Sequence, residues 1–343
     1  MSATTSVILG GGFGGIAAAN ALRRLLPAEH EVVVVDESPR FYVGAGKTWI
    51  MLGERTYDQV SQSRIALLAP GVRFVEARVQ KIGLSDRTVS LRAESLKWDF
   101  LVIALGADLN LAAVPGLADT AHTFYTVEGA QRLKAVLEQF SGGDVAILIP
   151  KTPFKCPPAP YEAALLLREA FERRGIAGKA RLAIHTVEGS PMATAGAEMG
   201  NYIKSELAQR AIAFFPQRRT SRVDAAAQRV VFEDGSEARY DLLIAIPPHE
   251  APQVVRDAQL VNQSGWIPVE PKTMQVKQPA GASGVYAIGD VTLVPLPGRH
   301  HPDIALSLPK AGVFAEAQGR IAAHRIAASI LGRTTDEVFD GKG

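Results

Sequence analysis

Cysteine is almost missing from this sequence: Cys156 is the single thiol in 343 residues. One thiol excludes an internal disulfide and any metal cage that is built from several thiolates. The C-x-x-C-H signature of c-type haem attachment is also absent. We therefore predict no metal site in this chain.

Excess charge and long apolar runs are lacking as well. The net charge is +2, from 37 basic and 35 acidic residues, so we expect no nucleic-acid partner. No apolar run is long enough to span a membrane, and the first predicted strand leaves no room for a signal peptide. We expect a soluble, cytoplasmic protein. A hydrophobic content of 47% over this length indicates two globular domains.

A glycine-rich turn near the N-terminus dominates what is present. A predicted strand at Val7–Leu9 leads into Gly10-x-Gly12-x-x-Gly15, which encloses Phe13 and Gly14 and precedes an alanine-rich helix. This spacing is the dinucleotide fingerprint: glycine allows the tight turn, the approach of a pyrophosphate, and close helix–strand packing. The N-terminus of the helix then favours the phosphates.

The next predicted strand ends in an acidic residue. Val32–Val35 runs into Asp36, which lies 21 residues after Gly15 and suits a bond to a ribose hydroxyl. Glu37 and Arg40 follow, and Arg40 could meet a phosphate or be a solvated loop residue. A glycine turn without a ligand is the alternative, but strand, turn, helix, strand and acid in this order favour a dinucleotide. The fingerprint does not separate FAD from NAD.

A second βαβ unit is predicted in the middle of the chain. The buried run 98–107 ends at the Gly106 turn, a helix follows at about 127–140, and a new strand covers 145–149. The turn after that strand reads Pro-Lys-Thr-Pro-Phe-Lys-Cys-Pro-Pro-Ala-Pro over 150–160. Proline supplies no N–H donor, so this turn has lost the phosphate cradle that NAD(P)H would need.

Cys156 stands in that turn, with Lys151 and Lys155 near it in sequence and a helix expected from Pro158. Cations and a helix N-terminus both lower the pKa of a thiol and raise its thiolate fraction. Glu162, on the first turn of the helix, could hold or relay a proton. A buried structural cysteine is the competing interpretation, and the residues leave both open.

The last third of the chain returns to the first domain. A short strand ends at Gly289-Asp290, where a carboxylate can bind the far end of a dinucleotide. Leu308–Gly312 is expected to open a long helix to about residue 331, with Pro309 suited to its first position. Lys310 at that helix N-terminus would stabilise negative charge on a bound cofactor; a surface lysine is the alternative.

Taken together, these residues resemble the two-dinucleotide-domain flavoproteins, and within them the branch of sulfide:quinone oxidoreductase and flavocytochrome c sulfide dehydrogenase. The resemblance covers nearly the whole chain. The motifs that carry it are Gly10-x-Gly12-x-x-Gly15, Cys156-Pro-Pro-x-Pro-Tyr161-Glu162, Ile246-Pro-Pro, Ser264-Gly-Trp-x-Pro-Val, Gly289-Asp290 and Pro309-Lys310. The cysteine–proline and Gly-Trp segments are the specific ones.

The resemblance implies an α/β fold of two Rossmann-like domains, the second inserted into the FAD-binding first. The implied boundaries are 1–112, 113–250 and 251–343. FAD would use Asp36 for the ribose, Val79 for the adenine edge through its backbone, and Asp290 for the ribityl end. Cys156 would be a redox cysteine that captures sulfur, and Lys310 would lie near the flavin pyrimidine edge.

The chain also departs from the family pattern. The second redox cysteine is replaced at Ile321 and Ala322, and no thiol near 41–49 could bind the flavin covalently, so FAD is expected to be non-covalent. The sequence stops at Gly343 inside a continuing family segment. We expect a longer native chain whose tail could bring another cysteine or a peripheral membrane contact, and a homodimer is compatible with the family.

The resulting hypothesis is an FAD-dependent oxidoreductase that oxidises sulfide or a small persulfide or thiol and passes electrons to a quinone or cytochrome. Two alternatives stay open. One is an NAD(P)H-dependent flavin reductase of the type II NADH dehydrogenase kind. The other is a non-enzymatic FAD-carrying subunit of a cytochrome complex.

Overall fold

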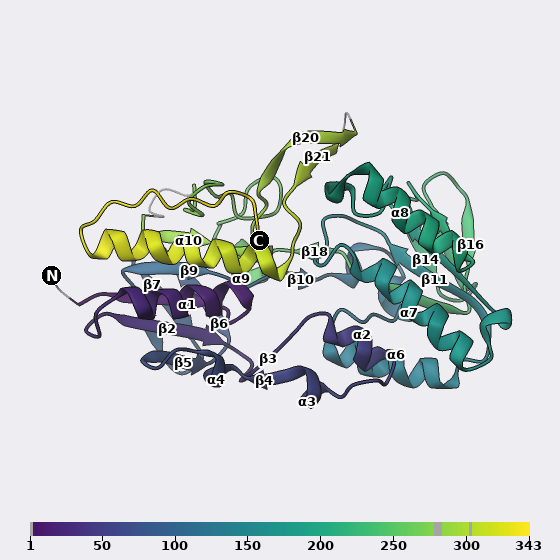
Figure 1. Cartoon of the computed structure of the whole chain (residues 1–343), viewed down its shortest axis with the longest axis horizontal. Coiled ribbons are helices and arrows are strands. Elements are labelled where there is room, and N and C mark those ends of the chain that lie inside the picture. Colours follow the sequence, from purple (N-terminus) through teal and green to yellow (C-terminus); the bar gives the residue numbers. More distant parts are fainter. Residues whose placement is uncertain (1–2, 278–282, 302–303) are drawn as a thin grey trace. The chain divides into compact units, whose positions relative to one another are not determined.

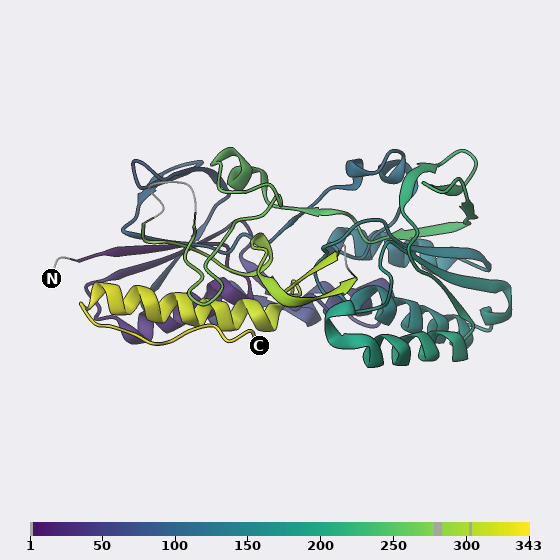
Figure 2. The ribbon, with the colours of Figure 1, turned by 90° about the horizontal axis from the view of Figure 1, so that it is seen from above.

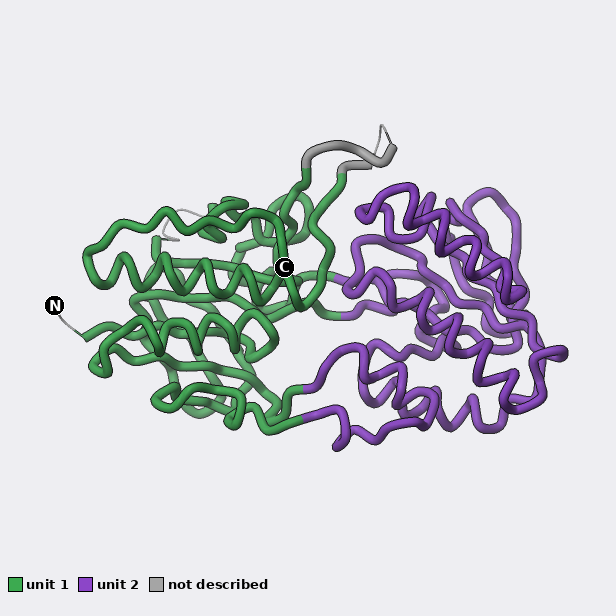
Figure 3. Tube along the Cα trace, viewed as in Figure 1, with its two compact units in different colours: residues 1–41, 62–108, 250–343 green, residues 42–61, 109–249 purple. Residues whose placement is uncertain are grey.

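The computed structural model describes residues 3–277, 283–301 and 304–343. It divides into two compact units (Figure 3): unit 1 comprises Met1–Phe41, Gln62–Asp108 and Glu250–Gly343, and unit 2 comprises Tyr42–Ser61 and Leu109–His249. Each unit contains a parallel sheet with helices packed on it. The predicted α/β class with two Rossmann-like sheets is therefore confirmed.

The sheet of unit 1 has the order β19-β9-β1-β2-β5, and all of its pairs are parallel. Its inner strands are almost wholly apolar because both faces of the sheet are covered, and Val32–Val35 are fully buried. The strands are β1 (Thr5–Leu9), β2 (Glu31–Asp36), β5 (Val72–Glu76), β9 (Phe100–Ile103) and β19 (Val285–Ala287).

Two helices, α1 (Phe13–Leu25) and α10 (Gly312–Ile330), lie side by side on one face of this sheet (Figure 1). Glycines let them approach closely: a Cβ on Gly319 would lie 2.3 Å from the Gly14 carbonyl oxygen, and one on Gly14 would lie 2.7 Å from that of Ala315. The opposite face is covered by the antiparallel sheet of β6 (Val79–Gly83), β7 (Thr88–Leu91) and β8 (Ser95–Lys97), as Figure 2 shows.

The remaining elements of unit 1 are short. They are α4 (Arg64–Leu67), α9 (Gln253–Asp257), the 3₁₀ turn η4 (Gly289–Val291), and the antiparallel pair β20 (Pro295–His301) and β21 (Ile304–Ser307). The chain passes between the units within β3 (Arg40–Tyr42), β4 (Ser61–Ser63), β10 (Asp108–Leu109) and β18 (His249–Glu250).

Unit 2 is built on the parallel sheet β13-β12-β11-β17. Along β11 (Gly143–Ile149), Val145, Ile147 and Ile149 pack with the helices, while Ala146 and Leu148 pack with the β-hairpins on the other face. This alternation fills two cores from one strand, which explains the unbroken apolar run. Its partners are β12 (Ala180–Thr186), β13 (Ile212–Phe215) and β17 (Leu242–Ala245).

The helical side of unit 2 is formed by α2 (Gly46–Met51), α6 (Val127–Gln139) and α7 (Ala159–Arg173), with α8 (Gly196–Gln209) against β13. The other side carries the antiparallel sheet of β14 (Thr220–Asp224), β15 (Arg229–Phe232) and β16 (Glu237–Arg239). Shorter pieces are α3 (Tyr57–Val60), α5 (Leu117–Thr120), η1 (Leu111–Ala113), η2 (Ala177–Lys179) and η3 (Ala193–Ala195).

The predicted elements agree with these bounds except at the last helix. α10 begins at Gly312, so Pro309 is not its first residue and Lys310 lies before its N-cap. The prediction was wrong because Leu308 is held by a backbone hydrogen bond to Val294, and Lys310 is held by two carbonyls, which keeps this segment out of the helix. Within the described residues, no helix is both long and apolar enough to cross a membrane.

Candidate functional site

The glycine turn of unit 1 connects β1 to α1, and each fingerprint glycine has a different reason to be glycine. Gly10 has a φ of +96°, and a Cβ on Gly15 would lie 1.8 Å from the Gly10 carbonyl oxygen. Gly12 caps α1, and a Cβ there would meet nothing within 4 Å. Gly10 and Gly15 are therefore required by the fold, whereas the space beside Gly12 is open for a ligand.

Asp36, at the end of β2, reaches this turn. Its Oδ2 accepts a hydrogen bond from the Gly11 N–H at 2.7 Å, and its Oδ1 accepts one from Ser38 at 3.0 Å. The guanidinium of Arg64 lies 3.2 Å from the same Oδ1. Asp36 is thus fixed against the glycine turn with which the dinucleotide fingerprint associates it.

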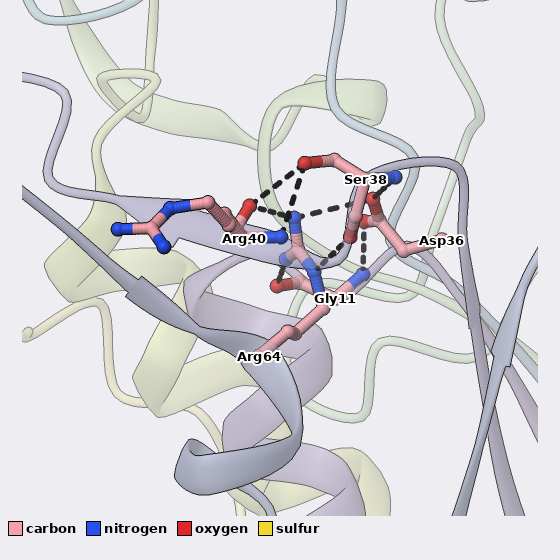
Figure 4. Close-up of polar contacts among 5 residues, drawn as sticks. All are labelled: Gly11, Asp36, Ser38, Arg40 and Arg64. Carbon is pink, nitrogen blue, oxygen red and sulfur yellow. Dashed lines mark hydrogen bonds and ion pairs between the residues drawn. The ribbon is translucent and has the colours of Figure 1, made fainter. Parts of the chain in front are cut away.

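Arg64, from the start of α4, is the centre of this cluster (Figure 4). Its side chain is only 7% exposed, and it donates to the carbonyls of Gly11, Ser38 and Arg40 in addition to its ion pair with Asp36. One buried cation therefore holds together the glycine turn, the loop after β2 and the carboxylate. We call Gly11, Asp36, Ser38, Arg40 and Arg64 the turn cluster.

The other predicted residues around the turn have mixed surroundings. Phe13 is 39% exposed and packs edge-on against Phe41, with ring centroids 5.0 Å apart. The side chain of Arg40 points away from the turn cluster, and only its backbone joins it (Figure 4). Glu37 is exposed and lies 3.6 Å from Arg78. Val79 is buried at the start of β6.

The predicted residues at the far ends of β9 and β19 also fall in unit 1. Gly106 follows β9 with a φ of +73°, and a Cβ there would again meet nothing within 4 Å. Gly289 follows β19, and its N–H donates to Gln318 Oε1 at 2.7 Å. Asp290 lies in the 3₁₀ turn η4 beside it.

Lys310 is buried at 6% exposure in the same region. Its Nζ donates to the carbonyls of Asp290 and Thr292 at 2.6 and 2.8 Å and lies 3.4 Å above the ring centroid of Trp266. Burial lowers the pKa of Lys310 to about 7, although the Asp290 carboxylate opposes this. The surface-lysine alternative is excluded. Lys310, Asp290 and Gln318 line one small pocket with Pro309 and Phe314.

These features fit a bound dinucleotide in unit 1. Gly12 and Gly106 leave open space where a side chain would otherwise project, and α1 begins at that point with no acidic residue in its first turn. A helix N-terminus of this kind suits a diphosphate. Among the described residues, Asp36 Oδ2 accepts one hydrogen bond, so an acceptor position remains for a ribose hydroxyl.

In unit 2, the turn after β11 carries Cys156 instead. The thiol is half-buried, and the residue has a φ of +57°, a left-handed conformation that is uncommon for a side-chain-bearing residue. The Cys156 carbonyl accepts from Ala159, the first residue of α7. Just before it, the Lys155 carbonyl accepts from the Tyr125 hydroxyl at 3.0 Å.

A cation close to this thiol comes from another part of the sequence. Lys47, on α2, has its pKa lowered to about 8 by burial and by Lys155, while Cys156 acts in the opposite direction. Tyr125 is 4% exposed, and burial raises its pKa, helped by Cys156 and Glu188. The thiol thus lies within electrostatic reach of a lysine and a tyrosine of its own unit.

In this unit an acid, Glu188, follows the second strand, β12, two residues after its end, whereas Asp36 is the last residue of β2; Glu188 is already bonded. Tyr161, on α7, donates its hydroxyl to Glu188 Oε2 at 2.6 Å, and Thr186 donates to the same atom at 3.2 Å. Burial raises the pKa of Glu188 against the lowering effect of these hydrogen bonds. Glu162, the next residue after Tyr161, lies at the surface. Partial desolvation of its carboxylate raises its pKa as well.

Sequence reasoning missed three of these groups. Glu188 could have been found, because it follows β12 as Asp36 ends β2. Arg64 and Lys47 gave no signal, since Arg64 is 53 residues from Gly11 and neither belongs to a motif. No group of three or more His, Cys, Asp and Glu residues within the described ranges could hold a metal ion.

Comparisons with known proteins agree with this geometry. The family model described as pyridine nucleotide-disulphide oxidoreductase matches residues 4–319. The mitochondrial sulfide:quinone oxidoreductase of Mus musculus is 25% identical over 301 residues, which are 84% of this chain and 66% of the mouse protein. The chain therefore spans just under two thirds of that relative.

Two further similarities point in different directions. The structure of the sulfide:quinone oxidoreductase from Aquifex aeolicus superposes with a TM-score of 0.83 at 24% identity, covering 96% of this chain and 78% of that one. An alternative NAD(P)H-ubiquinone oxidoreductase of Arabidopsis thaliana is 30% identical, but over 193 residues that make up 49% of this chain and 36% of the plant protein.

Proposed function

Because this chain belongs to the pyridine nucleotide-disulphide oxidoreductase family, we propose that it is an FAD-dependent oxidoreductase of sulfur compounds. Its substrate is sulfide or a small persulfide or thiol, and its electrons pass to a quinone or cytochrome. The mouse relative, which matches 84% of this chain, and the Aquifex structure are both named sulfide:quinone oxidoreductase, and they support this assignment over the plant match, which covers 49% of this chain.

The observation that carries the proposal is the turn after β11. A nicotinamide dinucleotide needs free N–H groups in that turn and an acid for its ribose. Here prolines occupy positions 150, 153, 157 and 158, and Glu188 is already bonded to Tyr161. The turn presents a thiol instead, in unit 2, where Lys47 lies within electrostatic reach of it.

FAD would be held without a covalent bond by unit 1. Gly12 and the N-terminus of α1 would face the diphosphate, Asp36 the ribose, and Asp290 with Gly289 the ribityl end. Lys310 would place positive charge near the pyrimidine edge. When bound, FAD supplies the acceptor for two electrons.

The residues of unit 2 would handle the sulfur. The Cys156 thiolate and hydrosulfide would form one S–S bond with loss of two electrons and one proton, which leaves a persulfide anion on Cys156; bound FAD would supply the two-electron oxidant that this step requires. Glu162, whose pKa is raised, takes up the proton that is released. Cys156 is the single cysteine of the sequence given, and we propose that a small thiol then removes the outer sulfur.

The test is anaerobic reduction of the bound flavin, followed by absorbance, with sulfide and NADH added separately to the wild type and Cys156→Ser. Sulfide should bleach the wild type, and the variant should be slower by about 1,000-fold, since the nucleophile itself is removed. Glu162→Gln is the matched control: it keeps the thiol and should slow the reaction less. Bleaching by NADH alone would overturn the proposal in favour of an NAD(P)H-dependent reductase.

A partner-dependent role gives a different result. Lack of bleaching by either donor, with FAD bound, would contradict independent catalysis and favour an FAD-carrying subunit that needs a cytochrome.

A further inference from the structure

The turn cluster contains one residue that the dinucleotide fingerprint does not account for. Arg64 follows β4, outside the β1–α1–β2 segment, yet its guanidinium contacts the glycine turn, the strand-end acid and the loop after β2. A buried arginine normally serves either to satisfy carbonyls or to pair a carboxylate. Arg64 does both at the edge where the adenosine half of a dinucleotide would bind.

We propose that Arg64 is a positioning residue that makes unit 1 selective for the adenine dinucleotide form of flavin over the mononucleotide. It does so by holding Asp36 against the glycine turn and by compensating its charge. This inference rests on the proposed function, which places FAD in unit 1.

The contacts around Asp36 support this positioning role. Asp36 is 17% exposed, and its two oxygens are directed by Gly11 and Ser38, whose own carbonyls are both bonded to Arg64. The arginine therefore fixes both the carboxylate and the backbone donors that orient it. With Oδ1 occupied by Ser38 and Arg64, Oδ2 retains the acceptor position that can face a ribose hydroxyl.

The charge of Asp36 beside the glycine turn supports the same role. An uncompensated carboxylate bonded to the Gly11 N–H would place negative charge next to the turn that must accept a diphosphate. The ion pair with Arg64 at 3.2 Å removes that repulsion without occupying the open space at Gly12. Removal of one partner from a buried pair leaves an unpaired charge, which is strongly unfavourable.

The packing of Arg64 also explains Gly11, a glycine that the fingerprint does not require. Gly11 lies at a variable position of G-x-G-x-x-G, yet a Cβ there would lie 2.6 Å from Cδ and 3.0 Å from Nη1 of Arg64. A side chain at Gly11 would displace this part of Arg64, because the arginine packs directly on the Gly11 backbone. The turn and the arginine thus form one unit, which links Gly11 to a residue 53 positions away.

The experiment compares dissociation constants of FAD and FMN for the apoprotein, measured by quenching of flavin fluorescence, in the wild type, Arg64→Met and Arg64→Lys. FMN lacks the adenosine part that Asp36 would contact. Arg64→Met should weaken FAD binding by about 30-fold and FMN binding by less than about 3-fold. Arg64→Lys restores charge without the forked contacts, so it should recover part of the FAD affinity.

Arg168 provides the matched control. It is 6% exposed in unit 2 and donates to the carbonyls of Ala177 and Ala211; among the described residues it has no carboxylate partner, and it lies outside the glycine turn. Arg168→Met should lower the urea midpoint of the apoprotein and leave the FAD-to-FMN affinity ratio unchanged.

The outcomes separate this inference from the proposed function. Equal losses of FAD and FMN affinity in Arg64→Met, or no loss of either, would overturn the role of Arg64 while leaving the flavin assignment intact. A wild type that binds neither flavin would instead overturn the proposed function itself.

Discussion

Two βαβ segments of this chain begin alike and differ at the first turn. In unit 1, β1–Gly10…Gly15–α1–β2 ends in Asp36; in unit 2, β11–turn–α7–β12 is followed by Glu188. In the first, the turn is bare glycine and the acid faces it. In the second, the turn is rich in proline, and the acid is bonded to Tyr161 from α7, the helix that follows the turn. We propose that the same supersecondary structure serves a ligand in one unit and a thiol in the other.

The two acids also differ in how the fold keeps them in a buried site. Asp36 has a buried guanidinium as its partner, so its charged form is compensated. Glu188 is bonded by two neutral hydroxyls, and burial raises its pKa. Only the first arrangement pairs the carboxylate with a cation and leaves one of its oxygens with an acceptor position for a ribose.

We expect the largest change in stability from substitutions in the glycine turn. Gly15→Ala brings a Cβ into the Gly10 carbonyl and should lower the free energy of unfolding of the apoprotein by about 3 kcal/mol. Gly12→Ala meets open space, so it should change that free energy by less than about 1 kcal/mol while weakening FAD binding about 10-fold. Urea unfolding and flavin titration measure both quantities.

Equal effects of the two substitutions on stability would show that Gly12 is also required by the fold. The distinction between the glycines that shape the turn and the glycine that admits the ligand would then be lost.

A smaller effect concerns the acid of unit 2. The folded-state pKa of Glu188 is raised above its ordinary value, so the folded protein holds this proton more tightly than the unfolded chain. Stability from this group is present at low pH and is lost as the pH rises through the raised folded-state pKa. Glu188→Gln cannot ionise, and it should therefore remove this part of the decline.

The measurement is the urea midpoint of wild type and Glu188→Gln between about pH 4 and pH 8, where a carboxyl with a raised pKa titrates. The two curves should converge at the acidic end and separate toward neutral pH, with the variant more stable. Parallel curves would mean that Glu188 is as well compensated as Asp36.

Much of the architecture could be predicted because it depends on local patterns. The glycine spacing and the apolar strand before it are local, and so are the acid at Asp36 and the prolines around Cys156. The start of α10 could not be predicted, because the carbonyls that hold Lys310 come from Asp290 and Thr292, about 20 residues earlier. Arg64 and Lys47 escaped for the same physical reason, since their partners are distant in sequence and neither stands in a recurring motif.

We propose that one βαβ segment of this chain binds a dinucleotide and that the other has lost that capacity. Isothermal titration of the apoprotein with FAD, followed by titration of the FAD-bound protein with NADH, measures both properties. We expect saturable binding of one FAD per chain and no NADH binding at millimolar concentration. Saturable NADH binding to the FAD-bound protein would show that the second segment still binds a dinucleotide.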